Sequence, residues 1–508
     1  MGLRVAEGGP LFGRAERALG WSVASTAIGK LSTLAIGIAL ARILGPEEFG
    51  TFAVALVALL AVLSFNELGV SLAIVRWPGE PEDIVPTVAT LSVLSSAVTY
   101  AGCWLAAPAF SALMGDPAAT DTVRLLCVCV FVNGLVAAPA AVLQRRFRQD
   151  RKLVADQVTT WVGALTSIGC ALAGMGAISL AIGQLTGSVA GAVLLAAFAP
   201  SALRLGFDPA RARALLRFGL PLAGSSIVVF AAGNVDRLIV GAVLGPVPLG
   251  LYVLAVNLSN WPVAVFSQPV RAVAPATLAR LQHDPASMRS TFLTTLGLLA
   301  AVTAPVCALL GGAAEPLVRL VYGAVWVPAA DVLPWLAALA VLRVLFELHY
   351  DHLVVLARTG VVFTAQVLWL AALVPATVVG ARAAGAPGAA AAALVVAALV
   401  VAPVYLTAVR REGIAPSAVG RRVAPPVGGA LAVGVLAWLA TRSLGPDLLA
   451  LAVAAVPAVV AVALLLYRSR RDVRRLRADL GRPAPATSEQ ERVLALAETP
   501  GTSGVIRP

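Results

Sequence analysis

Charged and titratable residues inside long apolar runs are the part of this sequence that could do chemistry. The run RVLFELHYDH contains Arg343, Glu347 and Asp351, whose spacing of four places them on one face of a helix. The glutamate, histidine and aspartate side chains of this run, Glu347, His349, Asp351 and His352, can change charge within a membrane, so the run predicts a proton relay. The plainer alternative is an ion pair between Arg343 and Glu347 within one helix. His349 and His352 lie on the same run without further cysteine or histidine ligands, which argues against a metal site.

Two other apolar runs contain charges. Lys30 lies about 14 Å into the first run, at a rise of about 1.5 Å per residue. Its ammonium could attract an anionic substrate, pair with Glu67 of the next run, or snorkel to the membrane surface. Asp236 and Arg237 are adjacent, beside Asn234, and only one of the two charges can face a cavity because neighbouring helical residues point about 100° apart. The alternative is a local ion pair at the level of the lipid headgroups.

Uncharged polar side chains also lie inside apolar runs. They could hydrogen-bond the hydroxyl groups of a ligand, although hydrogen bonds between helices explain them equally well. We expect Asn66, together with Asn234, to contribute to ligand binding. The full set is Asn66, Asn133, Asn257, Asn260, Gln184 and Gln366.

The elements that must position these residues are membrane-spanning helices. The chain of 508 residues is 59% hydrophobic and 13% charged, whereas soluble domains are about 45–50% apolar and about 25% charged. A helix of about 20 apolar residues crosses a hydrocarbon core of about 30 Å. The sequence therefore predicts an all-α, polytopic membrane protein of about 14 transmembrane helices. The apolar runs lie near 21–43, 49–68, 86–113, 121–143, 153–174, 178–200, 217–241, 249–274, 291–312, 333–356, 361–381, 388–409, 424–441 and 447–467.

Positive charge alternates along the connections between these runs. By the positive-inside rule, the arginine-rich connections and both termini are predicted to be cytoplasmic. The net charge of +12 is then explained by membrane orientation, with anionic lipid headgroups as partners and no nucleic acid. The basic connections contain Arg145, Arg146, Arg148, Arg151, Lys152, Arg204, Arg211, Arg213, Arg217, Arg271, Arg280, Arg289, Arg410, Arg411, Arg421 and Arg422, and a basic tail starts at Arg468.

Several kinds of site are not predicted. The five cysteines lie within apolar runs and are expected to be core residues, without a disulfide or a metal. The first 20 residues contain no apolar stretch that would form a signal peptide. No Gly-x-x-x-x-Gly-Lys loop is present, so the energy for any transport would come from an ion gradient, the substrate gradient or a partner. No cofactor is expected.

A short motif is repeated along the chain. LGPEEFGTF begins at Leu44, and LGPVPLGLY begins at Leu244. The offset matches one unit of six helices, which predicts two parallel repeats about an axis along the membrane normal, enclosing a central cavity. The alternative is turn chemistry alone, because glycine suits a helix C-terminus and proline suits a first turn. A third LGP, at Leu444, lacks the second glycine and the aromatic residue and is interpreted as a turn.

The repeat predicts the domain organisation. Two six-helix bundles are followed by an extra helix pair and by a tail too polar and proline-rich to form a core. The predicted parts are a cytoplasmic lead-in (1–20), an N-terminal bundle (21–204), a C-terminal bundle (205–410), the helix pair (411–467) and a basic, partly disordered cytoplasmic tail (468–508).

Four stretches resemble one family of membrane transporters. ALARILGPEEFGTFAVALVALLAVLSFNELGVSLAIVR (39–76) resembles the N-terminal region of Wzx-type polysaccharide flippases, in the superfamily that also holds multidrug and toxin extruders and lipid II flippases. AVLQRRFRQDRKLVADQ (141–157), GMGAISLAIGQLTG (174–187) and RFGLPLAGSSIVVFAAGNVDRLIVGAVLG (217–245) resemble later segments of the same family. The resemblance covers residues from about 15 to about 410 and implies twelve to fourteen helices in two bundles.

The resemblance implies a function. The chain is expected to be a flippase of the cytoplasmic membrane, and not an enzyme, that translocates a polyprenyl-diphosphate-linked oligosaccharide by alternating access. Lys30, Arg237 and Arg343 would attract the diphosphate or acidic sugars, and Glu347, Asp351, Asp236 and Glu67 are candidates for binding a coupling ion. A polysaccharide polymerase and glycosyltransferases are possible partners.

Three alternatives remain open. The first is a cation-coupled exporter of drugs or metabolites from the same superfamily, which a cationic cavity disfavours. The second is a membrane glycosyltransferase or ligase, which would normally need longer outer loops than these. The third is a scaffold in a biosynthetic complex, which a transport assay would separate from a carrier.

Overall fold

The computed structural model describes residues 9–66, 70–76, 81–146, 148–281 and 284–470, and these residues form helices and turns without a strand. The N-terminal half contains α1 (Gly9–Asn66), α2 (Val70–Arg76), η1 (Pro81–Asp83), α3 (Val85–Leu113), η2 (Pro117–Ala119), α4 (Thr120–Arg145), α5 (Gln149–Leu172), α6 (Ile178–Phe198) and η3 (Pro200–Leu203).

The second half begins with the long helix α7. Its elements are α7 (Pro209–Leu244), α8 (Pro246–Pro262), the π-helical turn η4 (Val263–Ser267), α9 (Gln268–Arg280), α10 (Pro285–Gly312), α11 (Ala314–Tyr322), η5 (Ala324–Asp331), α12 (Leu333–Val355), α13 (Thr359–Val396), the π-helical turn η6 (Ala397–Val401), α14 (Ala402–Arg411), α15 (Pro416–Ser443) and α16 (Asp447–Arg468).

The apolar runs predicted as spans are helical in the described residues except at the ends of some runs, such as residues 173–174 and 199. A kink at Gly45 divides α1 between the first two runs, and a kink at Ala384 and Gly385 divides α13. Ten helical stretches of the described residues are long and apolar enough to cross a membrane, and two of them contain these kinks. The runs at 153–174 and 217–241 lie in α5 and α7, outside that set. The all-α membrane fold is therefore confirmed, while the number of crossings stays a prediction.

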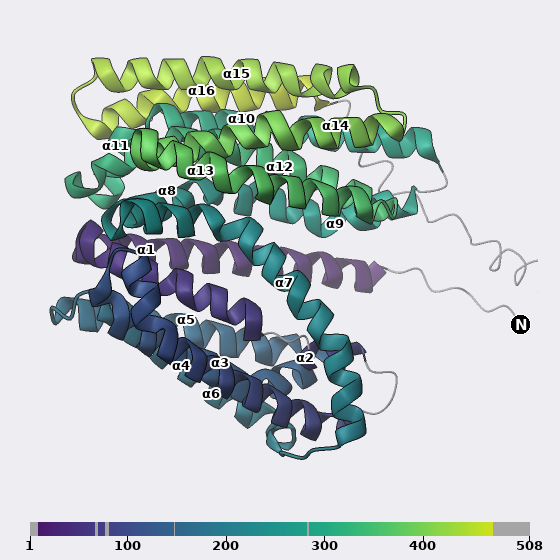
Figure 1. Cartoon of the computed structure of the whole chain (residues 1–508). Helices are drawn as coiled ribbons and strands as arrows, with labels where there is room; N and C mark the ends of the chain where they lie inside the picture. The colour runs from purple at the N-terminus through teal and green to yellow at the C-terminus, as the bar shows by residue number, and fades with distance from the viewer. Residues whose placement is uncertain (1–8, 67–69, 77–80, 147, 282–283, 471–508) are drawn as a thin grey trace, which may run out of the picture.

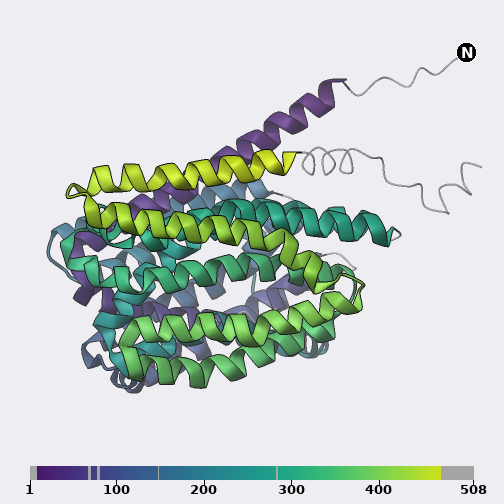
Figure 2. The same ribbon diagram turned by 90° about the horizontal axis from the view of Figure 1, so that it is seen from above.

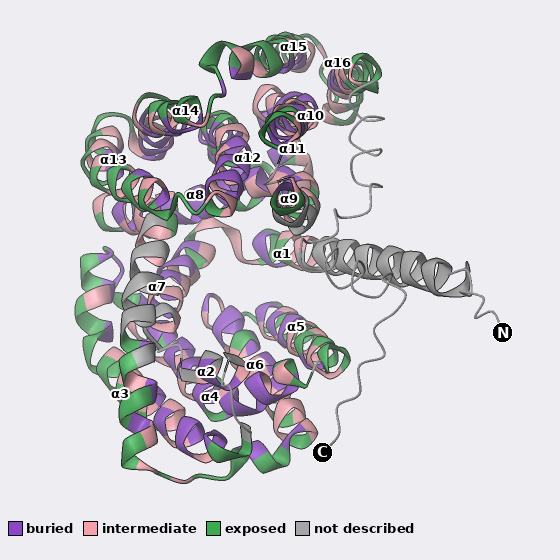
Figure 3. Ribbon diagram, turned by 90° about the vertical axis from the view of Figure 1, so that its right-hand side faces the viewer, coloured by how far each residue is buried: buried purple, intermediate pink, exposed green. Residues whose placement is uncertain are grey.

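The helices form two groups (Figure 1). We call α1 to α6 the N-lobe and α8 to α14 the C-lobe. The helix α7 crosses from one lobe to the other, and α1 is the N-lobe helix that lies beside the C-lobe (Figures 1 and 3). α15 and α16 pack against each other and against α10, on the outer side of the C-lobe. Figure 2 shows this pair lying side by side along one face of the molecule. It corresponds to the extra helix pair predicted from the sequence.

The molecule has two chemically different ends. At one end lie the turns at Gly45, Gly174, Gly245 and Gly323, all glycines with positive φ; we call it the hairpin end, on the left of Figure 1. At the other end, the basic end, α1 begins and α16 ends (Figure 1). Arginines of the basic connections end helices there, among them Arg145 of α4, Arg411 of α14 and Arg468 of α16.

The two lobes share a buried core only at the hairpin end, among the described residues. The largest apolar cluster there combines N-lobe residues such as Val54 and Leu126 with C-lobe residues such as Leu249 and Leu333. Toward the basic end, the N-lobe and the C-lobe have separate clusters. Burial of apolar area is the main stabilising term in such contacts, so the described side chains join the lobes firmly at the hairpin end.

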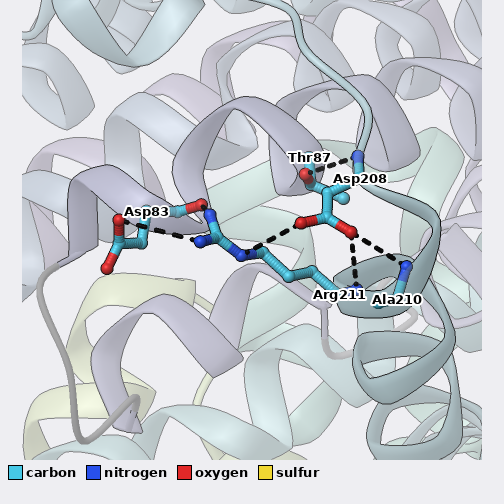
Figure 4. Close-up of polar contacts among 5 residues, drawn as sticks. All are labelled: Asp83, Thr87, Asp208, Ala210 and Arg211. Carbon is cyan, nitrogen blue, oxygen red and sulfur yellow. Dashed lines mark hydrogen bonds and ion pairs between the residues drawn. The ribbon is translucent and has the colours of Figure 1, made fainter.

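The start of α7 is fixed to the N-lobe (Figure 4). The Asp208 carboxylate caps α7 by accepting hydrogen bonds from the N–H groups of Ala210 and Arg211, at 2.9 and 3.2 Å. The N–H of Asp208 donates to the Thr87 hydroxyl of α3 at 3.3 Å, and the Arg211 guanidinium pairs with Asp208 and Asp83 at 3.3 and 3.8 Å. α7 therefore starts as part of the N-lobe and ends against the C-lobe.

One prediction about the cysteines is wrong. A disulfide joins Cys103 of α3 to Cys127 of α4, although the sequence suggested five unpaired core cysteines. The two residues are separated by 24 positions along the chain and meet because α3 and α4 are antiparallel neighbours. Cys129, Cys170 and Cys307 are free.

Candidate functional site

A charged cavity of about 410 Å³ lies inside the C-lobe. Its walls come from α7, α9, α12, α13, η6 and α14. The charged lining residues are Asp236, Arg271, Arg343 and Glu347, accompanied by the amide of Gln366. Four aromatic side chains, Phe346, Tyr350, Trp369 and Tyr405, form much of the remaining wall. Charges in a membrane-spanning bundle are costly unless they face a cavity or a partner, and here they do both.

Arg271 of α9 holds the two carboxylates of α12. Its Nε and Nη2 atoms donate to Asp351 at 3.0 and 3.2 Å, the bidentate geometry that suits a guanidinium. Its Nη1 atom lies 3.7 Å from Glu347, which also accepts a 2.5 Å hydrogen bond from the Ser267 hydroxyl in η4. The Asp351 side chain is only 7% exposed, so this ion pair fixes α9 against α12.

Arg343 is not the partner of Glu347. The expected alternative, an ion pair between these residues within one helix, is wrong because Glu347 pairs with Arg271 instead. The Nη1 atom of Arg343 lies 3.4 Å from the Oδ1 of Asn260 on α8. A neutral amide leaves the positive charge of Arg343 to act on whatever enters the cavity, whereas the charge of Arg271 is balanced by two carboxylates.

On α7, the neighbours Asp236 and Arg237 point in different directions. Asp236 lines the cavity and accepts a 2.9 Å hydrogen bond from the buried Tyr252 hydroxyl. Arg237 donates to the Asn234 side chain at 2.9 Å, and Asn234 donates to the carbonyl of Phe230 at 3.1 Å. The structure thus turns the acid into the cavity, while the arginine is bound to an amide and not to its neighbour.

Three predicted site residues fall outside this description. Glu67 lies outside the described residues, as do the side chains of Lys30 and Asn66, although the backbone of both belongs to α1. Their roles stay predictions.

Three residues of the site, Arg271, Ser267 and Tyr252, were not predicted from the sequence. Arg271 looked like one of many arginines that orient the protein in the membrane. Its partner Asp351 is 80 positions away, so no local pattern connects them. A weak signal was available, because Arg271 falls inside the predicted run at 249–274 and not beyond its end.

The repeated LGP motifs meet each other at the hairpin end. Gly45 (φ 74°, ψ 176°) and Gly245 (φ 88°, ψ −173°) have the same backbone conformation, which glycine alone adopts readily. A Cβ on Gly50 would lie 2.7 Å from the carbonyl carbon of Pro246. A Cβ on Gly250 would lie 2.9 Å from the carbonyl oxygen of Pro46. The second glycine of each motif therefore packs on the turn of the other motif, and the contact is reciprocal.

The third LGP does not share this geometry. Gly45 and Gly245 have positive φ, whereas Gly445 is absent from the glycines with positive φ in the described residues. Pro446 precedes α16 in an extended conformation, whereas Pro46 is helical within α1 and Pro246 is the first residue of α8. The interpretation of the third copy as an ordinary turn fits its structure.

Side chains reinforce the contact between the lobes. The indole N–H of Trp326 in η5 donates to the carbonyl of Ala41 at 3.0 Å, and its ring meets Phe49 edge to face at 5.4 Å. The Arg42 guanidinium donates to the carbonyls of Val321, at 2.7 Å, and Leu320 at the end of α11. These bonds satisfy backbone carbonyls at a helix C-terminus, which have no partner within their own helix.

Comparison with known proteins agrees with this architecture. A family model described as polysaccharide biosynthesis protein matches residues 39–331. The chain belongs to this family. The resemblance to polysaccharide flippases that the sequence motifs suggested is thereby confirmed.

Two bacterial proteins are similar to this chain in sequence. The succinoglycan biosynthesis transport protein ExoT of Rhizobium meliloti (strain 1021) is 30% identical over 333 residues, which cover 63% of this chain and 65% of ExoT. The lipopolysaccharide biosynthesis protein WzxC of Escherichia coli (strain K12) is 23% identical over 70% of this chain and 73% of WzxC. The match to ExoT thus spans slightly less than two thirds of that relative.

Solved structures of low sequence identity share the fold of this family member. The lipid II flippase MurJ in an inward closed conformation superposes with a TM-score of 0.72, at 13% identity, over 87% of this chain and 98% of MurJ. An inward-facing MATE transporter of the MOP superfamily gives a TM-score of 0.60, at 15% identity, over 78% of this chain and 99% of that chain. At these identities the likeness concerns the fold alone.

Proposed function

We propose that this protein is a flippase that moves a polyprenyl-diphosphate-linked oligosaccharide across the cytoplasmic membrane for the synthesis of a surface polysaccharide. The observation that carries the proposal is the asymmetry of the core: the lobes are joined at the hairpin end and have separate cores at the basic end. A carrier that alternates its access must close one end while the other is free to open. Membership of the family and the transport role in the name of ExoT support the same conclusion.

In this proposal the basic end faces the cytoplasm, with both termini, following the positive-inside rule. The substrate headgroup enters between the lobes from that end, and the polyprenyl chain stays in the surrounding lipid. The protein acts as a carrier and not as an enzyme. The glycosyltransferases that build the repeat unit and the polymerase that consumes it are its proposed partners.

The site residues predicted from the sequence have distinct proposed roles. Arg343, whose guanidinium contacts the Asn260 amide, attracts the diphosphate or acidic sugars, together with Lys30 and Arg237. Asn234 and Asn66 provide hydrogen bonds to the sugars.

Glu347 and Asp351 bind the coupling ion, and so do Asp236 and Glu67. Protonation of Glu347 would weaken its attraction for the Nη1 atom of Arg271, 3.7 Å away, and would leave that atom to an anion while Nε and Nη2 stay bound to Asp351. Uptake of a proton would in this way be linked to binding of the anionic substrate.

A scrambling assay tests the proposal. Purified protein is placed in liposomes that contain a fluorescent polyprenyl-diphosphate oligosaccharide, and a membrane-impermeant reductant destroys the label in the outer leaflet. We expect the protein to carry labelled lipid from the inner to the outer leaflet, so that the reductant also destroys the fluorescence of the inner leaflet. Arg343→Ala should slow this step, and so should Lys30→Ala, whereas Lys30→Arg should retain it.

The control is Arg442→Ala, which removes an arginine that stacks on Trp438 at the hairpin end of α15, far from the cavity. If intact protein leaves the inner leaflet protected, the flippase proposal fails. If it moves small organic cations and no lipid-linked sugar, the exporter alternative replaces it.

A further inference from the structure

A second pocket, of about 240 Å³, lies at the basic end on the outer side of the C-lobe. It is enclosed by three helices: α10, with Thr294, Gly297 and Ala301 along one face, and the extra helix pair α15 and α16. The pair packs on the side of α10 that points away from α7 and the N-lobe (Figures 1 and 3). The pocket is therefore separate from the cavity proposed for transport.

The pocket is strongly basic. Arg421 and Arg422 from the start of α15 line it together with Arg468 from the end of α16, and all three side chains are exposed. No aspartate or glutamate is among its described lining residues. The hydroxyls of Thr294 and Ser469 add polar groups, and Leu465 with Pro425 and Pro426 forms an apolar wall. Arginine clusters of this kind recognise phosphate through paired N–H donors.

The helix pair around the pocket presents an apolar surface to the membrane. Large aliphatic side chains are exposed along α15 and α16, where a bilayer would surround them: Leu431, Val435, Leu436, Leu448, Leu449, Val453, Val456, Val459, Val460 and Leu464. Figure 3 shows the exposed outer faces of both helices. The arginines therefore lie where an apolar, lipid-facing surface meets the basic end, at the depth of the lipid headgroups.

We infer that this pocket binds the phosphodiester headgroup of an anionic glycerophospholipid from the leaflet at the basic end. The guanidinium groups of Arg421 and Arg468 bind the phosphate, and the acyl chains lie along the apolar surface of α15 and α16. Basic pockets between transmembrane helices on the cytoplasmic side are suited to such headgroups. The bound lipid would bridge α16 to α15 and α10, and so hold the extra helix pair against the C-lobe.

A phospholipid fits better than a free phosphate ion, because the lipid brings apolar chains to a surface that is already apolar. The inference requires only that these helices span a bilayer. It does not depend on what the central cavity transports, so the two proposals can fail independently.

Native mass spectrometry of the full chain in detergent tests the inference. Phosphatidylglycerol is added to delipidated protein, and phosphatidylcholine serves as the zwitterionic control with the same phosphodiester. Each arginine near a membrane surface contributes about 1 kcal/mol toward an anionic lipid, so loss of two weakens binding about 30-fold. Arg421→Gln with Arg468→Gln is the test variant, and Arg442→Gln at the other end of α15 is the matched control.

We expect phosphatidylglycerol to bind the wild type and the Arg442 variant equally well. Its dissociation constant should be about 30-fold higher for the double variant. Arg421→Lys with Arg468→Lys should retain most of the binding, which separates loss of charge from misfolding. Equal retention of phosphatidylcholine, or unchanged binding in the double variant, would overturn the inference. Displacement of the lipid by millimolar inorganic phosphate would assign the pocket to a free anion instead.

Discussion

The reciprocal contact between Gly50 and Gly250 makes a specific prediction about conformational balance. Replacing Gly50 with alanine places a methyl group 2.7 Å from the carbonyl carbon and closer still to the carbonyl oxygen of Pro246, and 3.2 Å from the N–H of Val247. All three are backbone atoms of a helix start, which cannot rotate away. Because carbon and carbonyl oxygen normally approach to about 3.3–3.6 Å, the lobes must separate by about 1 Å at this point.

The cost of this clash falls on one state only. Overpacking a tight contact costs about 1–3 kcal/mol. When the hairpin end opens, the two motifs separate and the clash disappears, so the open state is favoured by a factor of about 5–150. Gly250→Ala should act in the same direction but more weakly, because its nearest contacts, at 2.9 and 3.0 Å, are longer.

The measurement is the distance between the lobes at the hairpin end. Spin labels at Met175 in the N-lobe and Val325 in the C-lobe, both exposed, report it by pulsed electron resonance. We expect a longer distance to gain population in Gly50→Ala. Gly37→Ala is the control on the same helix, because a Cβ there meets no atom within 4 Å. An unchanged distance distribution in stably folded Gly50→Ala would refute the idea that this glycine closes the hairpin end.

Two further predictions concern single contacts. Asp208→Ala removes the cap of α7 and should lower the free energy of unfolding by about 0.5–2 kcal/mol; Asp208→Asn should restore most of it in thermal unfolding, and equal stability of both variants would rule out a capping role. Arg271→Met leaves the buried Asp351 carboxylate without its bidentate partner. Breaking a fully buried ion pair lowers the free energy of unfolding by about 3–5 kcal/mol, and we expect a smaller loss here because the Arg271 side chain is 37% exposed. Adding Asp351→Asn should recover part of that loss, and a strictly additive double variant would contradict the pairing.

The sequence predicted the helices well for a simple physical reason. A helix that crosses a membrane needs about 20 consecutive apolar residues, so the length of each apolar run predicts the length of its helix. The break between the runs at 361–381 and 388–409 was visible as well, and the structure places a kink there at Ala384 and Gly385. The turns at Gly45 and Gly245 were also predictable, because few sequences other than Gly-Pro fit them.

Contacts between distant segments were not predictable. Whether Arg271 orients the chain or fills a cavity depends on how far α9 extends toward the basic end, and the same residue type serves both purposes. Cys103 and Cys127 meet only because α3 and α4 pack side by side. The second glycine of each LGP motif looked like part of a turn. Its lack of a side chain instead allows the backbone of the other motif, about two hundred residues away, to pack directly against it.

The reciprocal glycine contact also bears on how such a chain could arise. Because Gly50 packs on the second turn while Gly250 packs on the first, the surface is self-complementary, as in an isologous dimer with two-fold symmetry. Two separate copies of a six-helix ancestor could have closed against each other through the same surface before their genes were joined. The contact between Gly50 and Gly250 would then be older than the single chain that now contains both halves.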